Sequence, residues 1–480
     1  MATSPPSPGR RPNILFILSD QQRWDTLGCY GQTLPISPNL DRLASEGVLF
    51  EHAFTCQPVC GPCRSSLQSG LYPTATGCYI NNRALPVDQP TVAKQMRAAG
   101  YTTAYIGKWH LAADEEHPYR TTAVPPERRG GFDDYWMGSD VLEFTSHGYE
   151  GFVFDRDGNR VDWEGYRVDA MTNFVLDYLR DYASSPTLND KPFYMFASYI
   201  EPHHQNDLDR YIGPIGSKQR FASYPTPGDL AGTKGDWKKH YPDYLGCCWS
   251  LDQNVGRIRA QLELLGLWDN TLVIYTSDHG SHFRTRNGEY KRSCHEACLR
   301  VPLIMHGPGF AQARPRESSP QARPCSSSSL AGIAAGQKID QLVSLIDLPA
   351  TVLSAAGAEA LPVMHGRPIQ GLIDGSAKDW PREVFAQISE SHIGRTVRTA
   401  RWKYAVGVPL EVMKGTTAPG AERYVETFLY DLPADPHERN NLVADPALAT
   451  VRGELAATLK RRMVAAGEAE PTIVPAAHEA

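Results

Sequence analysis

The sequence predicts an α/β fold in which a mostly parallel sheet is flanked by helices and followed by a smaller C-terminal α+β subdomain with short antiparallel strands. Apolar, β-branched segments recur as near-continuous runs, which is typical of strands buried on both faces of a sheet. Helical stretches lie between these runs, and alternating strands and helices favour a doubly wound sheet. From about residue 380 the pattern changes to short strands, which indicates a smaller unit.

Five apolar runs are predicted to form strands, and each ends in a polar cluster. They cover residues 13–18, 102–106, 193–200, 272–276 and 301–305. Asp, Lys or His side chains stand at these ends. Because ligands of doubly wound sheets bind outside the carboxyl ends of the strands, we expect one shared site there. The spacing alone does not establish that these strands are neighbours.

Helical spacing of apolar residues predicts the main helices at residues 38–46, 91–99, 169–182 and 250–265. The C-terminal unit is predicted to contain strands at 384–388, 396–399, 403–408 and 428–430, and a helix at 447–465. We therefore expect a main domain at 10–379, a subdomain at 380–467 and tails at 1–9 and 468–480. A composition rich in Pro, Ser, Ala and Gly predicts a flexible insertion at 311–337.

Bulk properties exclude several classes of protein. The 480 residues carry a formal net charge of −6 and no Lys/Arg block, which argues against a nucleic-acid partner. No run of 18 apolar residues exists, so no membrane span is expected. The N-terminus has no apolar signal region, and the ten cysteines are scattered, so a cytoplasmic location with reduced thiols is expected. A signal that has been removed stays possible, and the oligomeric state stays open.

The stretch from Cys60 to Arg64 reads Cys-Gly-Pro-Cys-Arg. Pro62 suits the first position of a helix, which would end near Ser69 before Gly70. Cys60 would then lie at the helix N-terminus, where backbone N–H groups and the helix dipole favour anions. Arg64, four residues further on, would reach the Cys60 side chain. The Cys-x-x-Cys spacing also fits a redox motif or half a zinc site, although no second Cys-x-x-Cys exists to complete the latter.

The same stretch resembles the sulfatase signature, in which the cysteine is oxidised to formylglycine after translation. Further ordered segments resemble that family: residues 11–20, 27–31 and 33–50, the Gly-Lys-Trp-His at 107–110, the Pro-His at 202–203, the Ser-Asp-His-Gly at 277–280 and the segment 429–442. The resemblance implies a formylglycine-dependent sulfatase with an alkaline-phosphatase-like fold. It also implies maturation by a formylglycine-generating enzyme.

The resemblance assigns roles to individual residues. It implies a divalent metal, calcium first and manganese or magnesium next, because carboxylate oxygens are hard ligands. Two lysines would bind sulfate oxygens, one histidine would protonate the leaving alcohol, and another would deprotonate residue 60 in the second step. The expected metal ligands are Asp20, Gln21, Cys60, Asp278 and His279, and the expected catalytic residues are Cys60, Arg64, Lys108, His110, His203 and Lys291.

Two departures keep a second activity open. Gln21 stands where many sulfatases have an aspartate, and His279 stands where many have an asparagine. Both resemble phosphonate monoester hydrolases, which makes hydrolysis of a phosphonate monoester or phosphodiester the alternative. The Lys108/His110 pair favours sulfate, because those relatives lack it.

Three further side chains are weaker candidates for substrate contacts: Asn81, His204 and His295. Asn81 is equally suited to a turn, and His204 is the alternative to His203 as the working histidine. A non-catalytic protein that binds a sulfated or phosphorylated ligand is a third class. The complete set of candidate catalytic residues argues against it. Aryl, alkyl and carbohydrate sulfates all stay open as substrates.

Overall fold

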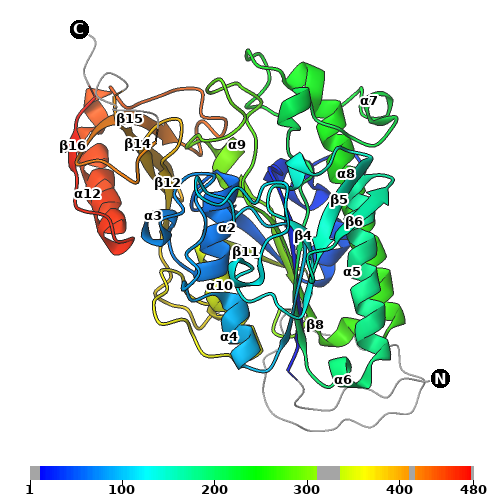
Figure 1. The fold of residues 1–480 in the computed structure, drawn as a ribbon. Helices are drawn as coiled ribbons and strands as arrows, with labels where there is room; N and C mark the ends of the chain where they lie inside the picture. The colour runs from blue at the N-terminus through cyan, green and yellow to red at the C-terminus, as the bar shows by residue number, and fades with distance from the viewer. Residues whose placement is uncertain (1–10, 311–335, 410–416, 477–480) are drawn as a thin grey trace, which may run out of the picture.

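A computed structural model describes residues 11–310, 336–409 and 417–476 and contains two sheets (Figure 1). The larger sheet is mixed and mostly parallel in its centre, and the smaller one lies near the C-terminus. In spatial order the larger sheet contains β11 (Gln337–Ser344), β2 (Val48–Phe54), β10 (Leu303–His306), β8 (Thr271–Ser277), β1 (Asn13–Ser19), β7 (Phe193–Ser198), β3 (Thr102–Lys108), β4 (Tyr135–Ser139), β5 (Glu150–Asp155) and β6 (Arg160–Glu164), with β9 (Arg300–Val301) beside β2. The predicted fold class is confirmed.

Strand β1 occupies the centre of the sheet and is buried along its whole length. It pairs in parallel with β7 on one side and β8 on the other. Ile14, Phe16 and Leu18 belong to one hydrophobic cluster, and Leu15 and Ile17 belong to another. Successive side chains of a strand point to opposite faces, so both faces of β1 need apolar residues. This is the physical reason for its continuous apolar run.

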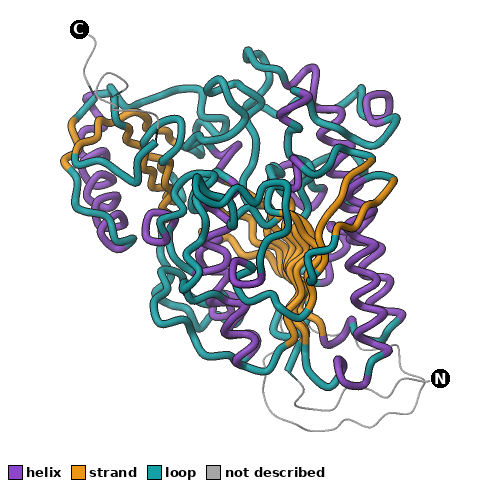
Figure 2. The backbone as a smooth tube through the Cα atoms, in the orientation of Figure 1, coloured by secondary structure: helices purple, strands orange, loops and turns teal. Residues whose placement is uncertain are grey.

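Helices cover both faces of the sheet (Figures 1 and 2). One layer contains α2 (Cys60–Ser69), α4 (Val92–Ala98) and α10 (Leu348–Ala356), whose apolar residues join the cluster of Phe16. The other contains α1 (Pro38–Glu46), α5 (Arg167–Ser184) and α8 (Trp237–Leu264), which join the cluster of Ile17. No helix of the described residues is long and apolar enough to cross a membrane.

Several elements differ from their predicted form. The run at 301–305 is split between β9 and β10, and β10 is antiparallel to β8, so its carboxyl end lies at the opposite edge of the sheet. Strands β2, β4, β5, β6 and β11 were not predicted, because polar residues interrupt their apolar patterns. Helix α8 begins at Trp237 rather than at 250, since Pro242 lies inside it and hides its start.

The smaller sheet contains β12 (Glu383–Ile388), β13 (Gly394–Thr399), β14 (Trp402–Gly407), β15 (Arg423–Asp431) and β16 (Thr472–Val474). The first four strands are antiparallel, and α12 (Ala449–Ala465) packs apolar residues against them. Strand β16 lies within the predicted tail 468–480 and pairs with β15, so this part of the tail belongs to the sheet. The predicted insertion at 311–337 and the tail at 1–9 lie mostly or wholly outside the described residues.

A buried ionic network joins the smaller sheet to helix α9 (Glu296–Leu299) of the main domain. Lys403 on β14 lies 2.8 Å from Glu296 on α9 and 2.6 Å from Glu438. The Lys403 side chain is fully buried, and both carboxylates are nearly so. A buried charge is tolerated only when it is paired, so these contacts fix the position of the smaller sheet relative to α9.

Candidate active site

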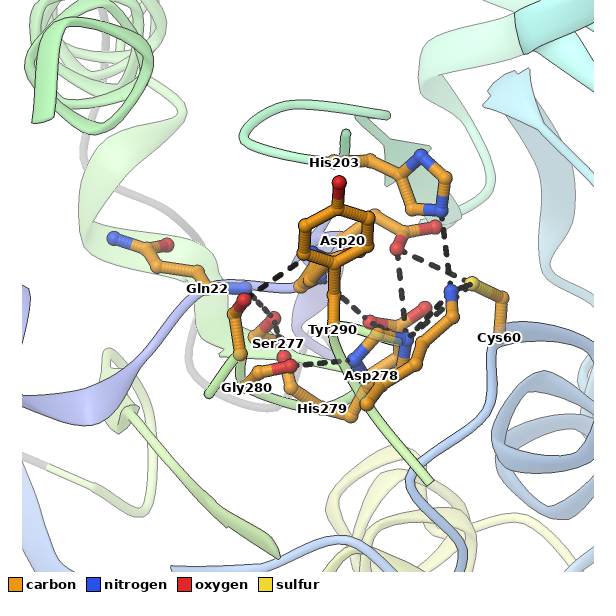
Figure 3. Close-up of polar contacts among 12 residues, drawn as sticks. Asp20, Gln22, Cys60, His203, Ser277, Asp278, His279, Gly280 and Tyr290 are labelled. Carbon is orange, nitrogen blue, oxygen red and sulfur yellow. Dashed lines mark hydrogen bonds and ion pairs between the residues drawn. The ribbon is translucent and has the colours of Figure 1, made fainter. Parts of the chain in front are cut away.

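The candidate site lies at the carboxyl ends of four neighbouring strands. Asp20 follows β1, Lys108 ends β3, His203 follows β7 and Asp278 follows β8. Cys60, at the start of α2, meets them from the helical layer, and Figure 3 shows the side chains of Asp20 and His279 directed toward its sulfur. The strand ends predicted to share one site are therefore adjacent in space.

Cys60 is the first residue of α2, with only 1% of its surface exposed. Pro62 is therefore the third helical residue and not the first, because the helix begins two residues earlier than predicted. Proline is still tolerated there, since N–H groups of the first turn have no partner within the helix. Gly70 ends the helix in a left-handed conformation with φ of 72°, as predicted.

Four buried side chains form a group that could hold a metal ion. Ligand atoms of Asp20, Cys60, Asp278 and His279 all lie within 4.8 Å of one another. The Cys60 Sγ lies 3.3 Å from Asp20 Oδ1 and 3.3 Å from His279 Nε2. Burial and the nearby charge of Asp20 raise the pKa of Asp278 to about 7. Two crowded buried carboxyl groups of this kind are stabilised by a bound cation.

Gln21 extends this group. Its amide nitrogen donates to the hydroxyl of Tyr211 at 2.7 Å, whereas its amide oxygen is buried without a hydrogen-bond partner. Asp278 Oδ2 is also buried without a hydrogen-bond partner. Two buried oxygens that accept no hydrogen bond from the described residues, beside a second carboxylate, fit a divalent cation that takes oxygen ligands.

Positive charges surround the Cys60 sulfur and the carboxylates. Lys108 Nζ lies 2.7 Å from Asp20 Oδ2, and Lys291 Nζ lies 2.9 Å from Cys60 Sγ. Burial by itself would raise the pKa of the Cys60 thiol, but the two lysines hold that pKa well below its usual range. Lys291 Nζ also lies 3.1 Å from His203 Nε2. This corner of the site therefore attracts anions.

Arg64 contacts Asp20 and Ser198, whereas the sequence predicted that it would reach the Cys60 side chain. Its guanidinium donates to Asp20 Oδ2 at 3.0 Å and to Ser198 Oγ at 2.6 Å, and it forms no hydrogen bond with Cys60. Its terminal nitrogen lies 3.0 Å from the carboxylate of Asp20 and 3.5 Å from that of Asp278, and both carboxylates attract it. Arg64 thus orients the group that could hold the metal.

A cavity of about 420 Å³ opens above Cys60. His110 and Asn81 line it, as expected for residues near a substrate. Asn81 lies in a turn and also accepts a hydrogen bond from the Gly61 backbone at 3.0 Å. The other lining residues include Gln21, Asn82, Lys108, Arg120, Val141, Glu143, Phe144, His203, Asn206, Arg284, Gly288, Glu289, Tyr290, Lys291, Arg292 and Glu390.

His204 and His295 do not line this cavity, so the structure does not support them as substrate contacts. His204 is buried behind Tyr290, with the rings stacked 4.1 Å apart and Nε2 2.8 Å from the tyrosine hydroxyl. His295 is buried against β15, where Nε2 lies 3.1 Å from the hydroxyl of Tyr430. Both histidines support neighbouring segments.

Sequence reasoning missed Asp140. It follows β4 and accepts hydrogen bonds from the backbone of Leu111, Ala112 and Ala113 at 2.8–2.9 Å. These bonds hold the loop directly after His110. An aspartate after an apolar segment could have indicated it, but β4 is too short and too interrupted for its pattern to be recognised.

The fold and the site define an enzyme of the sulfatase type. Residues 12–358 match the family model described as "Sulfatase", and residues 328–465 match the one described as "N-sulphoglucosamine sulphohydrolase, C-terminal". The chain belongs to the sulfatase family, whose members are sulfate ester hydrolases.

Several similar proteins are named as sulfatases of carbohydrates. An ulvan-active sulfatase of Formosa agariphila is 30% identical over 95% of this chain and 82% of its own length. An N-acetylglucosamine-6-O-sulfatase of Bacteroides thetaiotaomicron is 26% identical over 93% of this chain and 85% of its own. The phosphonate monoester hydrolase of Agrobacterium radiobacter shares the fold, with a TM-score of 0.65 and 20% identity over 95% of this chain and 96% of that one.

Proposed function

We propose that the protein hydrolyses a carbohydrate sulfate ester, with residue 60 acting as a formylglycine nucleophile beside a divalent metal. The observation that carries the proposal is the position of Cys60 Sγ, which lies between the carboxylate group and the ammonium of Lys291. Residue 60 is a cysteine in the structure, and its sulfur marks the place of the formylglycine oxygen. The names of the relatives support a carbohydrate as the alcohol part.

The donor set supports calcium as the first choice of metal. Asp20, Gln21 and Asp278 offer oxygens, and His279 offers Nε2. A bound cation would polarise the ester and favour ionisation of the hydrated aldehyde. His279 also makes manganese acceptable, since imidazole suits softer ions than calcium.

The chain's own residues divide the remaining chemistry. Lys108 and Lys291 bind the sulfate oxygens and stabilise the charge that develops on them. His203, with Nε2 beside Lys291, gives a proton to the leaving alcohol. His110 lines the cavity with Nδ1 free of any hydrogen bond, and it takes the proton that residue 60 releases when sulfate departs.

Parallel assays test this proposal. Protein co-expressed with a formylglycine-generating enzyme should release sulfate from sulfated saccharides, and peptide mass spectrometry should find residue 60 as the aldehyde. Cys60→Ala should abolish activity, whereas the matched control Cys63→Ala should keep it, because the Cys63 side chain packs in an apolar cluster. Full activity of Cys60→Ala would exclude the mechanism.

A phosphonate monoester or phosphodiester is the second candidate substrate. The observation that favours it is the imidazole of His279, which lies 3.3 Å from Cys60 Sγ among the candidate metal ligands. A phosphonate monoester assayed beside the sulfate esters separates the two activities. A higher kcat/KM for the phosphonate would replace the first proposal by the second.

A further inference from the structure

One arginine of the cavity differs from the others in its partners. Arg120, Arg284 and Arg292 all line the cavity above Cys60. Arg284 and Arg292 are held by nearby carboxylates, so their charges are neutralised locally. These carboxylates belong to Asp209, 2.8 Å from Arg284, and to Glu289 and Glu390, 2.6 and 2.7 Å from Arg292.

Arg120 has no such carboxylate. Among residues 11–310, 336–409 and 417–476 it forms no ion pair, and its guanidinium lies over the ring of Phe144. The guanidinium carbon lies 5.8 Å from the centre of that ring. Phe144 is itself 51% exposed and lines the same cavity. Contact with a ring face leaves the N–H groups of a guanidinium available to another partner.

The other charged side chains that line the cavity do not pair with the charge of Arg120. The Glu143 carboxylate faces other groups: it accepts two hydrogen bonds from Asn206, at 2.7 and 3.1 Å, and lies 3.8 Å from His203 Nδ1. The inner lysines contact Asp20 and Cys60, where the proposed function places the sulfate that is cleaved. Arg120 is therefore a cation of the cavity wall that the reacting sulfate does not require.

We propose that Arg120 binds a second anionic group, a sulfate or a carboxylate, on the saccharide that carries the reacting sulfate. This inference rests on the proposed function and narrows its substrate to polyanionic saccharides. A planar guanidinium matches both anions through paired N–H···O bonds. The exposed ring of Phe144 offers an apolar face to the sugar ring, next to the bound anion.

The surface beyond Phe144 limits where the second anion lies. A second hollow of about 760 Å³ continues past Glu143 and Phe144 across β5 and β6. Its wall includes Glu150 and Glu164, which form no ion pair within the described residues. Like charges repel, so this hollow disfavours an acidic sugar. The second anion therefore belongs on the sugar unit that fills the cavity, or on the side of the next unit that faces Arg120.

Binding to Cys60→Ala protein tests the inference without turnover. Calorimetric titrations would use N-acetylglucosamine 6-sulfate, glucosamine-2-N,6-O-disulfate, and a 6-sulfated glucosamine linked to a uronic acid. Adding Arg120→Gln should raise the dissociation constant of one or both dianionic ligands by about 10- to 100-fold, as expected for the loss of hydrogen bonds between charged groups. The dissociation constant of the monosulfate should change by less than about twofold, since its anion is bound by the lysines. The dianion that loses affinity identifies the second group.

Two further variants separate a contact from a general charge effect. Arg120→Lys keeps the charge and should restore part of the affinity for the dianions. Arg128→Gln removes an arginine from the same segment, outside the cavity and close to Asp114, and should leave the selectivity unchanged. In the active enzyme Arg120→Gln should raise KM for dianions and leave kcat within about twofold, because Arg120 stands apart from the reacting atoms.

Equal weakening of all three ligands by Arg120→Gln, or no weakening of any, would overturn the inference. An equal selective loss in Arg128→Gln would do the same. If the native enzyme hydrolyses none of these sulfates and the Cys60→Ala protein binds none of them, the proposed function itself is wrong. The two failures are therefore distinguishable.

Discussion

Replacing Lys291 by methionine removes one charge from the reacting centre and keeps most of the side-chain volume. The ammonium lies 2.9 Å from Cys60 Sγ, the position assigned to the nucleophile, and it is 7% exposed. At about 3 Å and an effective dielectric constant of about 20, two unit charges attract by about 5 to 6 kcal/mol. A sulfate ester already carries one negative charge before it reacts, so only part of this attraction lowers the barrier.

Loss of a single well-placed donor at a developing oxyanion lowers kcat by about 10² to 10³. We therefore expect Lys291→Met to lower kcat on an aryl sulfate and on a saccharide sulfate within that range. Initial rates at saturating substrate, with protein whose residue 60 is shown by mass to be converted, give the value. The conversion check is essential, because a substitution that blocked maturation would also abolish activity.

Lys338 provides the matched control. It forms an exposed pair with Glu51 at 3.0 Å, and its side chain is 59% exposed. Exposed pairs contribute about 0 to 1 kcal/mol to stability, so Lys338→Met should keep full activity and a similar melting temperature. A fully converted Lys291→Met enzyme with kcat within threefold of the native value would refute the assignment of Lys291.

Three further outcomes are expected. Removing divalent metal with a chelator should abolish hydrolysis, and calcium should restore it. Asp278→Asn should raise the calcium concentration needed, since a buried ligand oxygen is lost. Activity unaffected by chelation would contradict the metal site. His203→Gln should lower kcat by about 10² or more for a saccharide sulfate and far less for a nitrophenyl sulfate, whose leaving group needs no proton; equal losses would exclude His203 as the acid. Arg167→Met should lower the free energy of unfolding by about 3 to 5 kcal/mol in urea titrations, because Glu201, 2.8 Å away, stays buried without its partner, while the exposed Arg160→Met should change it by less than about 1 kcal/mol.

The reacting centre could be predicted from sequence because its residues follow regular elements. Asp20, Lys108 and Asp278 stand at the ends of buried strands, whose near-continuous apolar runs are easy to recognise. Cys60 stands at the start of a helix marked by a proline and a glycine. Regular hydrogen bonding then fixes where each side chain goes.

The sequence does not indicate where a side chain points when its direction depends on irregular backbone. His203 and His204 are adjacent after β7, yet the first lines the cavity and the second lies behind Tyr290. Nothing in a pair of neighbouring histidines indicates which one a turn directs inward. His295 shows the same limit, because its partner Tyr430 is 135 residues away and the contact depends on how the smaller sheet docks.

Substrate selection lies beyond sequence prediction for the same reason. Arg120 and Phe144 belong to loops without periodic pattern, and Arg284 is oriented by Asp209, which follows another strand. Their directions come from contacts between segments far apart in the chain, which propensities do not record. The hydrogen bonds of the sheet fix the strand ends, whereas these loops have no such regular hydrogen bonding. If the proposed function holds, substitutions at Arg120 and Phe144 would therefore change which saccharide is bound while the carboxylates and lysines around residue 60 keep their positions.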